Sequence, residues 1–264
     1  MNPNFWRVAH ASAIGLAHIN QNTECQDRFA CRTIETAAEG EILIAVVADG
    51  AGSTTDGQTG AAAACAIFTE EVADFLSAKD ARVKSLNEEF GRRWIGYFQQ
   101  QIAATAAADK KEPRDYASTL IGAVIGPTAA AFYQIGDGGI VFSPDGAPES
   151  YRFAVPPVEA EYVNVTDFIT DETAAERLRF VLVEEPVEDL ILFSDGIYAV
   201  AVDYQSNRPH EPFLMPMIAP LRRGGAVNGL NEKLENFLAS PKINEKTDDD
   251  KTIILASRAG ATSI

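Results

Sequence analysis

The sequence has few cations for its length. Its 264 residues include 22 Lys and Arg against 38 Asp and Glu, which gives a formal net charge of −16 at pH 7. Proteins bind nucleic acids largely through Lys and Arg contacts to phosphate, so this charge argues against nucleic acid as a partner. A protein this acidic that acts on an anionic substrate needs bound cations to invert its local field.

Long apolar runs and paired cysteines are also missing. No apolar stretch reaches the length of a membrane span, and Met1–His10 has no basic region followed by an apolar one. We therefore expect neither membrane insertion nor secretion. The three cysteines, at positions 25, 31 and 65, cannot all pair within one chain, which suits a reducing compartment. The cytoplasm is the expected location.

Several catalytic motifs are absent. The chain has no Gly-Lys-Ser/Thr phosphate loop and no Gly-x-Ser-x-Gly nucleophile elbow, and Gly50-Ala51-Gly52 lacks the third glycine of a dinucleotide fingerprint. No cysteine is followed six residues later by the Arg that a cysteine-dependent phosphatase needs, and no Cys-x-x-Cys pair indicates a zinc site. These absences exclude the corresponding nucleotide-binding, nucleophile-based and zinc-based mechanisms.

What the sequence does contain is a repeated pattern of apolar runs that end or begin in acid. Ile42–Ala48 is typical of a strand buried on both faces, and it ends in Asp49-Gly50. The pattern recurs where apolar runs lead to Asp137 and Asp195, and it is reversed where Asp248–Asp250 precedes Lys-Thr-Ile-Ile-Leu-Ala. If the strand that begins in acid runs antiparallel to strands that end in acid, these carboxylates gather at one edge of a sheet.

Such a group of acids suits hard divalent cations. Mg²⁺ and Mn²⁺ prefer carboxylate, carbonyl and water oxygens, and two such ions bridged by one carboxylate can position a water for attack on a phosphoryl group. Asp-Gly is also a common turn dipeptide, and a turn is the better interpretation of Asp145-Gly146, which follows Pro144. Within Asp248–Asp250 the choice of ligand stays open, because a solvated charge run has the same sequence.

Hydrophobic periodicity predicts an α+β fold. Helical spacing covers Ala61–Leu76, Leu86–Ile102 and Asn228–Leu238, and strand-like runs are Phe5–Ala17, Asp27–Thr33, Ile42–Ala48, Ser118–Ile125, Ala129–Ile135, Ile140–Phe142, Phe180–Val183, Leu190–Phe193 and Thr252–Ala256. Strands and helices come in blocks rather than alternating, so we expect antiparallel sheets in a layered sandwich. No linker interrupts residues 1–264, which predicts a single domain. His18–Gln26, Ser143–Tyr162 and the proline-containing Asp203–Pro216 are predicted loops.

Six short motifs follow one another along the chain. They are Cys-Gln-Asp-Arg-Phe at 25–29, Val-Ala-Asp-Gly-Ala-Gly-Ser at 47–53, Ala-Ser-Thr-Leu at 117–120, Gly-Asp-Gly-Gly at 136–139, Phe-Ser-Asp-Gly-Ile at 193–197 and Asp-Asp-Lys-Thr at 249–252. In this order they resemble the motifs of the metal-dependent serine/threonine protein phosphatases of type 2C, in a bacterial-like form. The resemblance implies an antiparallel β-sandwich core flanked by helices (αββα layers) and a phosphorylated protein as the substrate.

The resemblance also implies a role for each matching residue. Asp49 would bridge two Mg²⁺ or Mn²⁺ ions, the Gly50 carbonyl would bind the second ion, and Asp195 and Asp249 would hold the first. Asp27 would act near the second ion, directly or through water, and Asp137 matches the position of a third, weaker metal. Asp49, Asp195 and Asp249 would form the catalytic set, and the nucleophile would be a metal-activated water rather than a side chain.

The chain departs from the family pattern at several positions, and Ala199, in place of an acid that often follows the Ser-Asp-Gly motif, weakens the case for a third metal. Asn22 stands where many members carry an Arg that grips the substrate phosphate, which leaves His18 and Arg28 as the candidates for substrate binding. Ala51 stands where eukaryotic members place a His proton donor. Two alternatives therefore stay open on the same fold: a non-catalytic signalling module that binds a partner protein, and a hydrolase that acts on a small phosphorylated metabolite.

Overall fold

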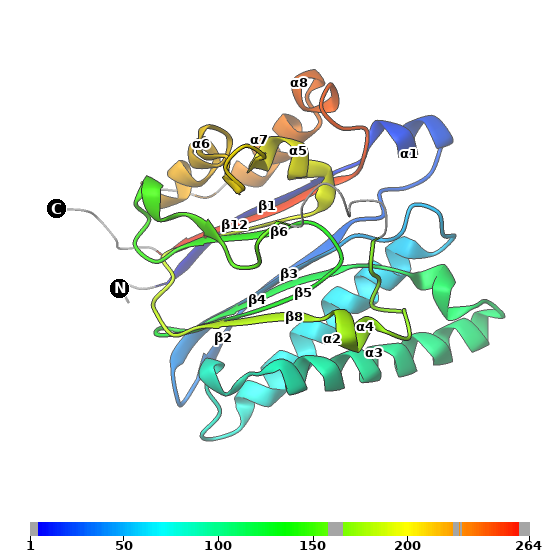
Figure 1. Cartoon of the computed structure of the whole chain (residues 1–264), viewed down its shortest axis with the longest axis horizontal. Coiled ribbons are helices and arrows are strands. Elements are labelled where there is room, and N and C mark those ends of the chain that lie inside the picture. Colours follow the sequence, from blue (N-terminus) through cyan, green and yellow to red (C-terminus); the bar gives the residue numbers. More distant parts are fainter. Residues whose placement is uncertain (1–4, 158–165, 224–226, 228, 259–264) are drawn as a thin grey trace.

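The computed structural model describes residues 5–157, 166–223, 227 and 229–258. Two five-stranded antiparallel sheets face each other, and helices cover the outer face of each sheet (Figure 1). This four-layer arrangement confirms the predicted α+β sandwich. No helix in these ranges combines the length and the apolar composition needed to cross a bilayer.

The first sheet joins segments from the two ends of the chain. Its strand order is β1-β12-β9-β6-β7, and each neighbouring pair is antiparallel. The strands are β1 (Trp6–Ala13), β12 (Lys251–Arg258), β9 (Asp189–Phe193), β6 (Gly139–Ser143) and β7 (Arg152–Phe153). Because β1 and β12 pair along their whole lengths, the first and last strands of the chain belong to one sheet.

The second sheet has the order β2-β3-β4-β5-β8. Its strands are β2 (Arg28–Thr36), β3 (Gly40–Ala48), β4 (Leu120–Ile125), β5 (Ala130–Ile135) and β8 (Arg179–Val183). Every residue of Ile42–Ala48 in β3 is fully buried, because helices cover one face of this sheet and the first sheet covers the other. The continuous apolar run therefore has the burial that the sequence predicted.

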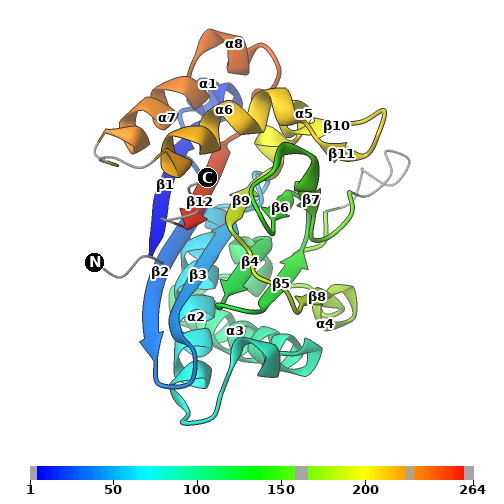
Figure 2. The ribbon, with the colours of Figure 1, turned by 90° about the vertical axis from the view of Figure 1, so that its left-hand side faces the viewer.

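Two long helices cover the second sheet, and two shorter ones cover the first (Figure 2). α2 (Gly57–Ser77) and α3 (Glu88–Asp109) lie on the second sheet, and α6 (Glu211–Arg222) and α7 (Leu230–Leu238) lie on the first. The remaining elements are α1 (Leu16–Gln21), α4 (Ala174–Arg177), α5 (Tyr198–Ala201), α8 (Pro241–Asn244), the hairpin strands β10 (Val202–Asp203) and β11 (Arg208–Pro209), and the 3₁₀ turns η1 (Val83–Ser85), η2 (Pro113–Tyr116), η3 (Pro148–Ser150) and η5 (Asp195–Ile197).

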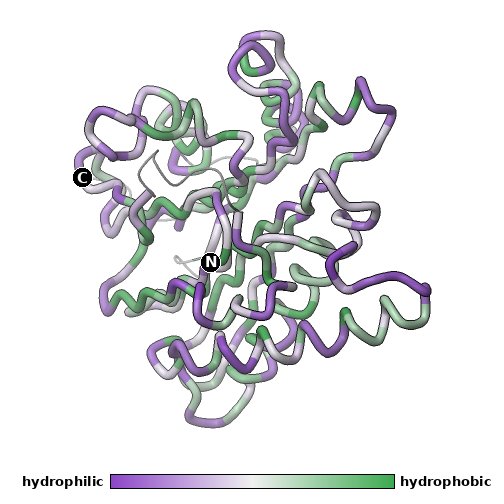
Figure 3. The backbone as a smooth tube through the Cα atoms, turned by 45° about the vertical axis from the view of Figure 1, so that its right-hand side comes forward, coloured by the Kyte–Doolittle hydropathy of each residue, from purple (hydrophilic) through white to green (hydrophobic). Residues whose placement is uncertain are grey.

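Three apolar layers hold the sandwich together. Alternate residues of β3 face opposite sides, so Ile44 packs toward α2 and α3 while Leu43 packs between the two sheets. A third layer lies between the first sheet and α6 and α7 and includes Leu214 and Leu255. Figure 3 shows the hydrophobic segments running through the sheets and the hydrophilic ones concentrated toward the outside.

Three local predictions were wrong. Asp203–Pro216 was expected to be irregular, but it contains the β10–β11 hairpin and the first half of α6, with Pro216 inside the helix. Leu214, Ile218 and Leu221 bury one face of α6 against the first sheet, and this burial offsets the backbone hydrogen bond that a proline cannot make. The first strand ends at Ala13 rather than at position 17, and the predicted loop after it begins with α1.

Three further predictions concern the C-terminal helix, the loop Ser143–Tyr162 and the turn at Asp145-Gly146, and the first two extend beyond the described residues. The predicted helix at the C-terminal end matches α7, but its first residue, Asn228, lies outside the described residues. Residues 158–162 of the predicted loop Ser143–Tyr162 also lie outside them. Asp145-Gly146 forms the expected turn, with Gly146 at a φ of +71°.

Phe68 joins α2 to both of its neighbours. Its ring is fully buried and packs edge-on against Trp94 of α3 and Tyr133 of β5 at centroid distances of 5.5 and 5.7 Å. We expect Phe68→Ala to lower the free energy of unfolding by about 3–5 kcal/mol, because it leaves a cavity in this layer. Urea unfolding measures the loss. Tyr97→Ala, on the exposed side of α3, is the control and should cost less than about 1 kcal/mol; equal losses would contradict the assigned packing.

Candidate metal centre

The fold brings the acidic strand ends to one end of the sandwich. Antiparallel pairing places the start of β2 beside the end of β3, and the start of β12 beside the end of β9. The acids at this end are Asp27 before β2, Asp49 after β3, Asp137 after β5, Asp195 after β9, and Asp249 before β12. We call these five residues the acid end. The predicted gathering of distant carboxylates therefore occurs, and it involves both sheets.

Asp27 connects the two sheets at the acid end. It is buried, and its Oδ2 accepts a hydrogen bond of 2.6 Å from the hydroxyl of Ser194, which follows β9. The same hydroxyl accepts the N–H of Thr252 in β12, so Ser194 fixes the start of β12 as well. The other oxygen of Asp27 is buried and has no hydrogen-bond partner among the described residues. One carboxylate oxygen of Asp27 is thus held in place, while the other has no partner among the described residues.

The backbone around Asp49 is held at both of its polar groups. Its N–H donates to Thr119 Oγ1 at 3.0 Å, and its carbonyl accepts the N–H of Thr119 at 2.8 Å. The next residue, Gly50, packs directly on Gly57, where a Cβ would lie 2.2 Å from a backbone carbon, so only glycine fits. The Gln26 carboxamide lies 2.9 Å from the Gly50 carbonyl oxygen, which orients its nitrogen toward that oxygen. These contacts fix the strand end that carries the predicted ligands.

Burial and mutual repulsion make the ionised form of the carboxyl groups at the acid end unfavourable. Burial raises the pKa of Asp49 well above its usual value, and the charges of Asp27 and Asp195 raise it further. Burial raises the pKa of Asp27 to about 6, against the effect of the Ser194 hydrogen bond, and burial together with the charge of Asp137 raises the pKa of Asp195 to about 8. Protonation of these carboxyl groups, or the binding of cations beside them, lowers this electrostatic free energy.

This donor set fits hard divalent cations. No three His, Cys, Asp or Glu side chains among the described residues already surround a single point closely enough to hold an ion. The site is nevertheless rich in carboxylates, with a backbone carbonyl at Gly50, and no Lys or Arg is among the main influences on the pKa values of Asp27, Asp49 and Asp195. Oxygen donors with uncompensated negative charge are the ligands that Mg²⁺ and Mn²⁺ prefer.

The three consecutive aspartates, among which the sequence could not choose a metal ligand, have different surroundings in the structure. Asp248 is exposed and Asp250 is fully buried. The Asp250 carboxylate accepts the N–H groups of Gly15 and Gln26 at 2.7 and 2.6 Å, so its oxygens are already used. Asp249 is half-buried, and burial raises its pKa. Its Oδ1 accepts the N–H of Asp250 at 2.8 Å, and its role as a metal ligand stays a prediction.

Asp137 lies beside Asp195 but has its own surroundings. Its Oδ2 accepts a hydrogen bond from Thr166, and its buried Oδ1 has no partner within the described ranges. Arg179, at the start of β8, donates to the carbonyl of Gly136 and interacts with the charge of Asp137. The neighbouring cation distinguishes Asp137 from the other acids, and its role at a third metal position stays a prediction.

The two predicted phosphate-binding side chains have structural contacts. His18 is buried, with Nδ1 2.9 Å from Oδ2 of Asp250. Arg28 donates to the carbonyls of Cys25 and Asp27 and to the Gln58 side chain, which ties the start of β2 to the start of α2. This geometry gives no support to a phosphate contact at either residue, and their substrate binding stays a prediction.

Three residues that hold the acid end received no role from the sequence. They are Gln26, Thr119 and Ser194, each of which positions a neighbouring acid or carbonyl. Each lies inside one of the six motifs, and this was the signal that they belong to the site. Their contacts could not be predicted, because each joins segments that are far apart in the chain.

Comparison with known proteins agrees with the fold. The chain is 34% identical to serine/threonine-protein phosphatase 3 of Escherichia coli (strain K12) over 254 residues, which cover 95% of this chain and 98% of the relative. The solved serine/threonine phosphatase of S. agalactiae matches 96% of this chain and 99% of its own, with a TM-score of 0.62 and 15% identity. The catalytic domain of PstP, solved in complex with two manganese ions, matches 96% of this chain and 98% of its own, with a TM-score of 0.57 and 13% identity.

These findings define the class of the protein as a phosphatase with the αββα sandwich fold. Residues 14–239 match the family described as protein phosphatase 2C. The chain belongs to the protein phosphatase 2C family.

The raised pKa values predict how pH and metal act on stability. Because the folded-state pKa values of Asp27 and Asp195 exceed the unfolded value of about 4, the folded protein binds more protons between pH 4 and 8 than the unfolded chain does. The stability of chelator-treated protein should therefore fall as pH rises through this window. Added Mn²⁺ should raise Tm more at pH 8 than at pH 5, which thermal unfolding measures. An equal rise at both pH values would contradict the repulsion.

Asp249 and Asp250 should respond differently to the same change. Asp250→Asn removes the charge that accepts two backbone N–H groups, and we expect it to cost about 2–4 kcal/mol of stability. Asp249→Asn should leave the stability of chelator-treated protein within about 1 kcal/mol and weaken Mn²⁺ binding in titration calorimetry. Each variant is the control for the other. Equal Mn²⁺ affinity in Asp249→Asn and wild type would show that Asp249 is not a ligand.

Proposed function

We propose that the protein hydrolyses phosphoserine and phosphothreonine in proteins at the acid end, with two Mg²⁺ or Mn²⁺ ions. The observation that carries this proposal is the group of buried carboxylates whose pKa values are raised by burial and by one another, in a chain of the protein phosphatase 2C family. The relative from Escherichia coli is a serine/threonine-protein phosphatase by name, which supports the substrate class.

In this proposal each acid has one role. Asp49 would help to hold both ions, the Gly50 carbonyl would help to hold the second, and Asp27 would act near the second directly or through water. Asp195 and Asp249 would hold the first ion, and Asp137 would serve a weaker third. When bound, the ions neutralise the acids and the substrate phosphate and supply an activated water. Ser194 holds Asp27 through its hydroxyl, and Thr119 holds the backbone of Asp49, so both acids are oriented before a substrate arrives.

We further propose that residues 1–264 form one catalytic domain that works in the cytoplasm in signal transduction. The pairing of β1 with β12 and the span of the family match support a single domain. The three cysteines, none of them in a disulfide, suit a reducing compartment.

A second candidate is a partner-binding module without catalysis. Asn22, at the position of the phosphate-binding Arg in many family members, is the C-cap of α1 with a left-handed φ of 56°. It therefore has a structural role, and the contacts of His18 and Arg28 leave the phosphate without an identified cationic side chain. Stoichiometric Mn²⁺ binding without hydrolysis would favour this module, and hydrolysis confined to small phosphorylated metabolites would favour a small-molecule phosphatase.

Hydrolysis of a phosphothreonine peptide in the presence of Mn²⁺ tests the proposed function. We expect release of phosphate by wild type, loss of activity on chelation, and at least a hundredfold lower kcat for Asp49→Asn, because that variant lacks the bridging charge. Asp145→Asn, which changes an Asp-Gly pair in a turn, is the matched control and should keep full activity. Full activity in Asp49→Asn, or none in wild type, would refute the proposal.

A further inference from the structure

β2 is an edge strand with an open side. Among the described strands it pairs with β3 alone, and all nine of its residues are partly or fully exposed. It contains no proline, so its backbone N–H groups are intact. An edge of this kind presents unpaired N–H and C=O groups with which another extended chain can pair.

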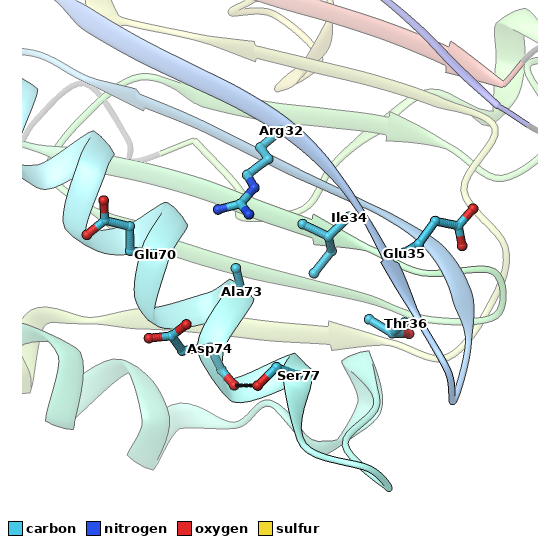
Figure 4. A pocket seen from close by; sticks show the side chains of 8 residues that line it. All are labelled: Arg32, Ile34, Glu35, Thr36, Glu70, Ala73, Asp74 and Ser77. Atoms are coloured by element: carbon cyan, nitrogen blue, oxygen red, sulfur yellow. Dashed lines mark hydrogen bonds between the residues drawn. The ribbon is translucent and has the colours of Figure 1, made fainter.

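A pocket of about 420 Å³ adjoins this edge (Figure 4). It lies between β2 and the flank of α2, and it is open to solvent. Its lining residues are Arg32, Ile34, Glu35 and Thr36 from β2, and Glu70, Ala73, Asp74 and Ser77 from α2. The four α2 residues follow the spacing of one helical face, so the pocket has one strand wall and one helix wall.

The walls of the pocket suit a long basic side chain. Ile34 and Ala73 are half-buried and form an apolar floor that can hold an aliphatic stem. Glu70 and Asp74 are exposed on the helix wall, and neither forms an ion pair with a described residue. These two carboxylates outnumber the single guanidinium of Arg32, whereas Glu35 points away from the pocket (Figure 4). The pocket therefore carries net negative charge above an apolar base, which complements Lys or Arg.

The open edge leads from the pocket to the acid end. β2 begins one residue after Asp27, and Arg32 and Ile34 lie five and seven residues beyond that acid. At about 3.3 Å per residue, the distance along the strand is roughly 17–23 Å. A peptide paired with β2 would thus reach the pocket about five to seven residues from the residue at the acid end.

We propose that the β2 edge and its pocket dock the protein substrate. An extended segment of the phosphoprotein pairs with β2, and a Lys or Arg five to seven residues from the phosphorylated residue occupies the pocket. This inference rests on the proposed phosphatase function and adds a substrate preference to it. The net charge of −16 attracts cationic segments in general, and the pocket gives that attraction a position.

Phosphothreonine peptides of equal length and composition test the docking. One Lys is placed six residues before the phosphothreonine, six after it, or two from it, because an edge strand can accept a peptide in either direction. We expect one of the two six-residue spacings to lower KM about three- to tenfold relative to the two-residue spacing, with kcat unchanged. Methylation of single backbone nitrogens in that peptide should raise KM at every second residue, since a strand bonds to its neighbour with that period.

Two charge reversals on α2 provide the matched comparison. Glu70→Lys should remove the KM advantage of the six-residue spacing, whereas Glu71→Lys, a neighbour outside the pocket lining with the same change in charge, should keep it. Equal effects of the two variants, or no effect of spacing in wild type, would overturn the docking. A change in sedimentation caused by Glu70→Lys alone would assign the edge to a second copy and would also overturn it.

Hydrolysis of p-nitrophenyl phosphate separates this inference from the proposed function. The compound is too small to reach the pocket, so wild type, Glu70→Lys and Glu71→Lys should hydrolyse it alike. Equal hydrolysis without a spacing preference overturns the docking alone. No hydrolysis of this compound or of any peptide by wild type overturns the phosphatase function itself.

Discussion

The burial of several like charges at one end of the sandwich is the constraint on which the rest of the structure depends. Carboxylates repel one another weakly in water but strongly where burial lowers the effective dielectric constant. Here burial and the neighbouring acids together raise the pKa of Asp49, and no Lys or Arg is among the main influences. The compensating charge must therefore come from protons or from bound cations. In a phosphatase of the protein phosphatase 2C family, this requirement couples the stability of the site to its chemistry.

The surrounding architecture keeps the acids together against that repulsion. Ser194 joins Asp27 to β12, and Asp250 holds the turns that contain Gly15 and Gln26. Close backbone contacts add to these bonds: a Cβ at Gly196 would lie 1.9 Å from the carbonyl oxygen of Asp250. Each contact joins segments from different sheets or from distant parts of the chain. The acid end is thus a product of the packed sandwich and cannot form from any one strand and turn.

How much the sequence predicts follows from the range of the interactions involved. The buried strand β3 and the helical face of α2 depend on local periodicity, and both were predicted. The choice among Asp248, Asp249 and Asp250 depends on which carboxylate meets Gly15 and Gln26, contacts that lie more than 220 residues away in the chain. The same limit explains α6, whose prolines indicated a loop while burial against the first sheet favoured a helix. The sequence indicated the acids, but it did not indicate the hydrogen bonds that show which of these acids is occupied by backbone N–H groups.

A phosphate group presents the same chemistry in every phosphoprotein, so the acid end alone gives little basis for choosing among substrates. Selectivity needs contacts farther along the bound chain, and β2 is the strand that runs from Asp27 toward the pocket between Arg32 and Asp74. An open edge also carries the risk of pairing with a second copy. Here a second copy would bring its own acidic pocket and its own net charge of −16, and like charges oppose that contact. In the proposed docking, the same negative charge that opposes self-association would favour a cationic peptide.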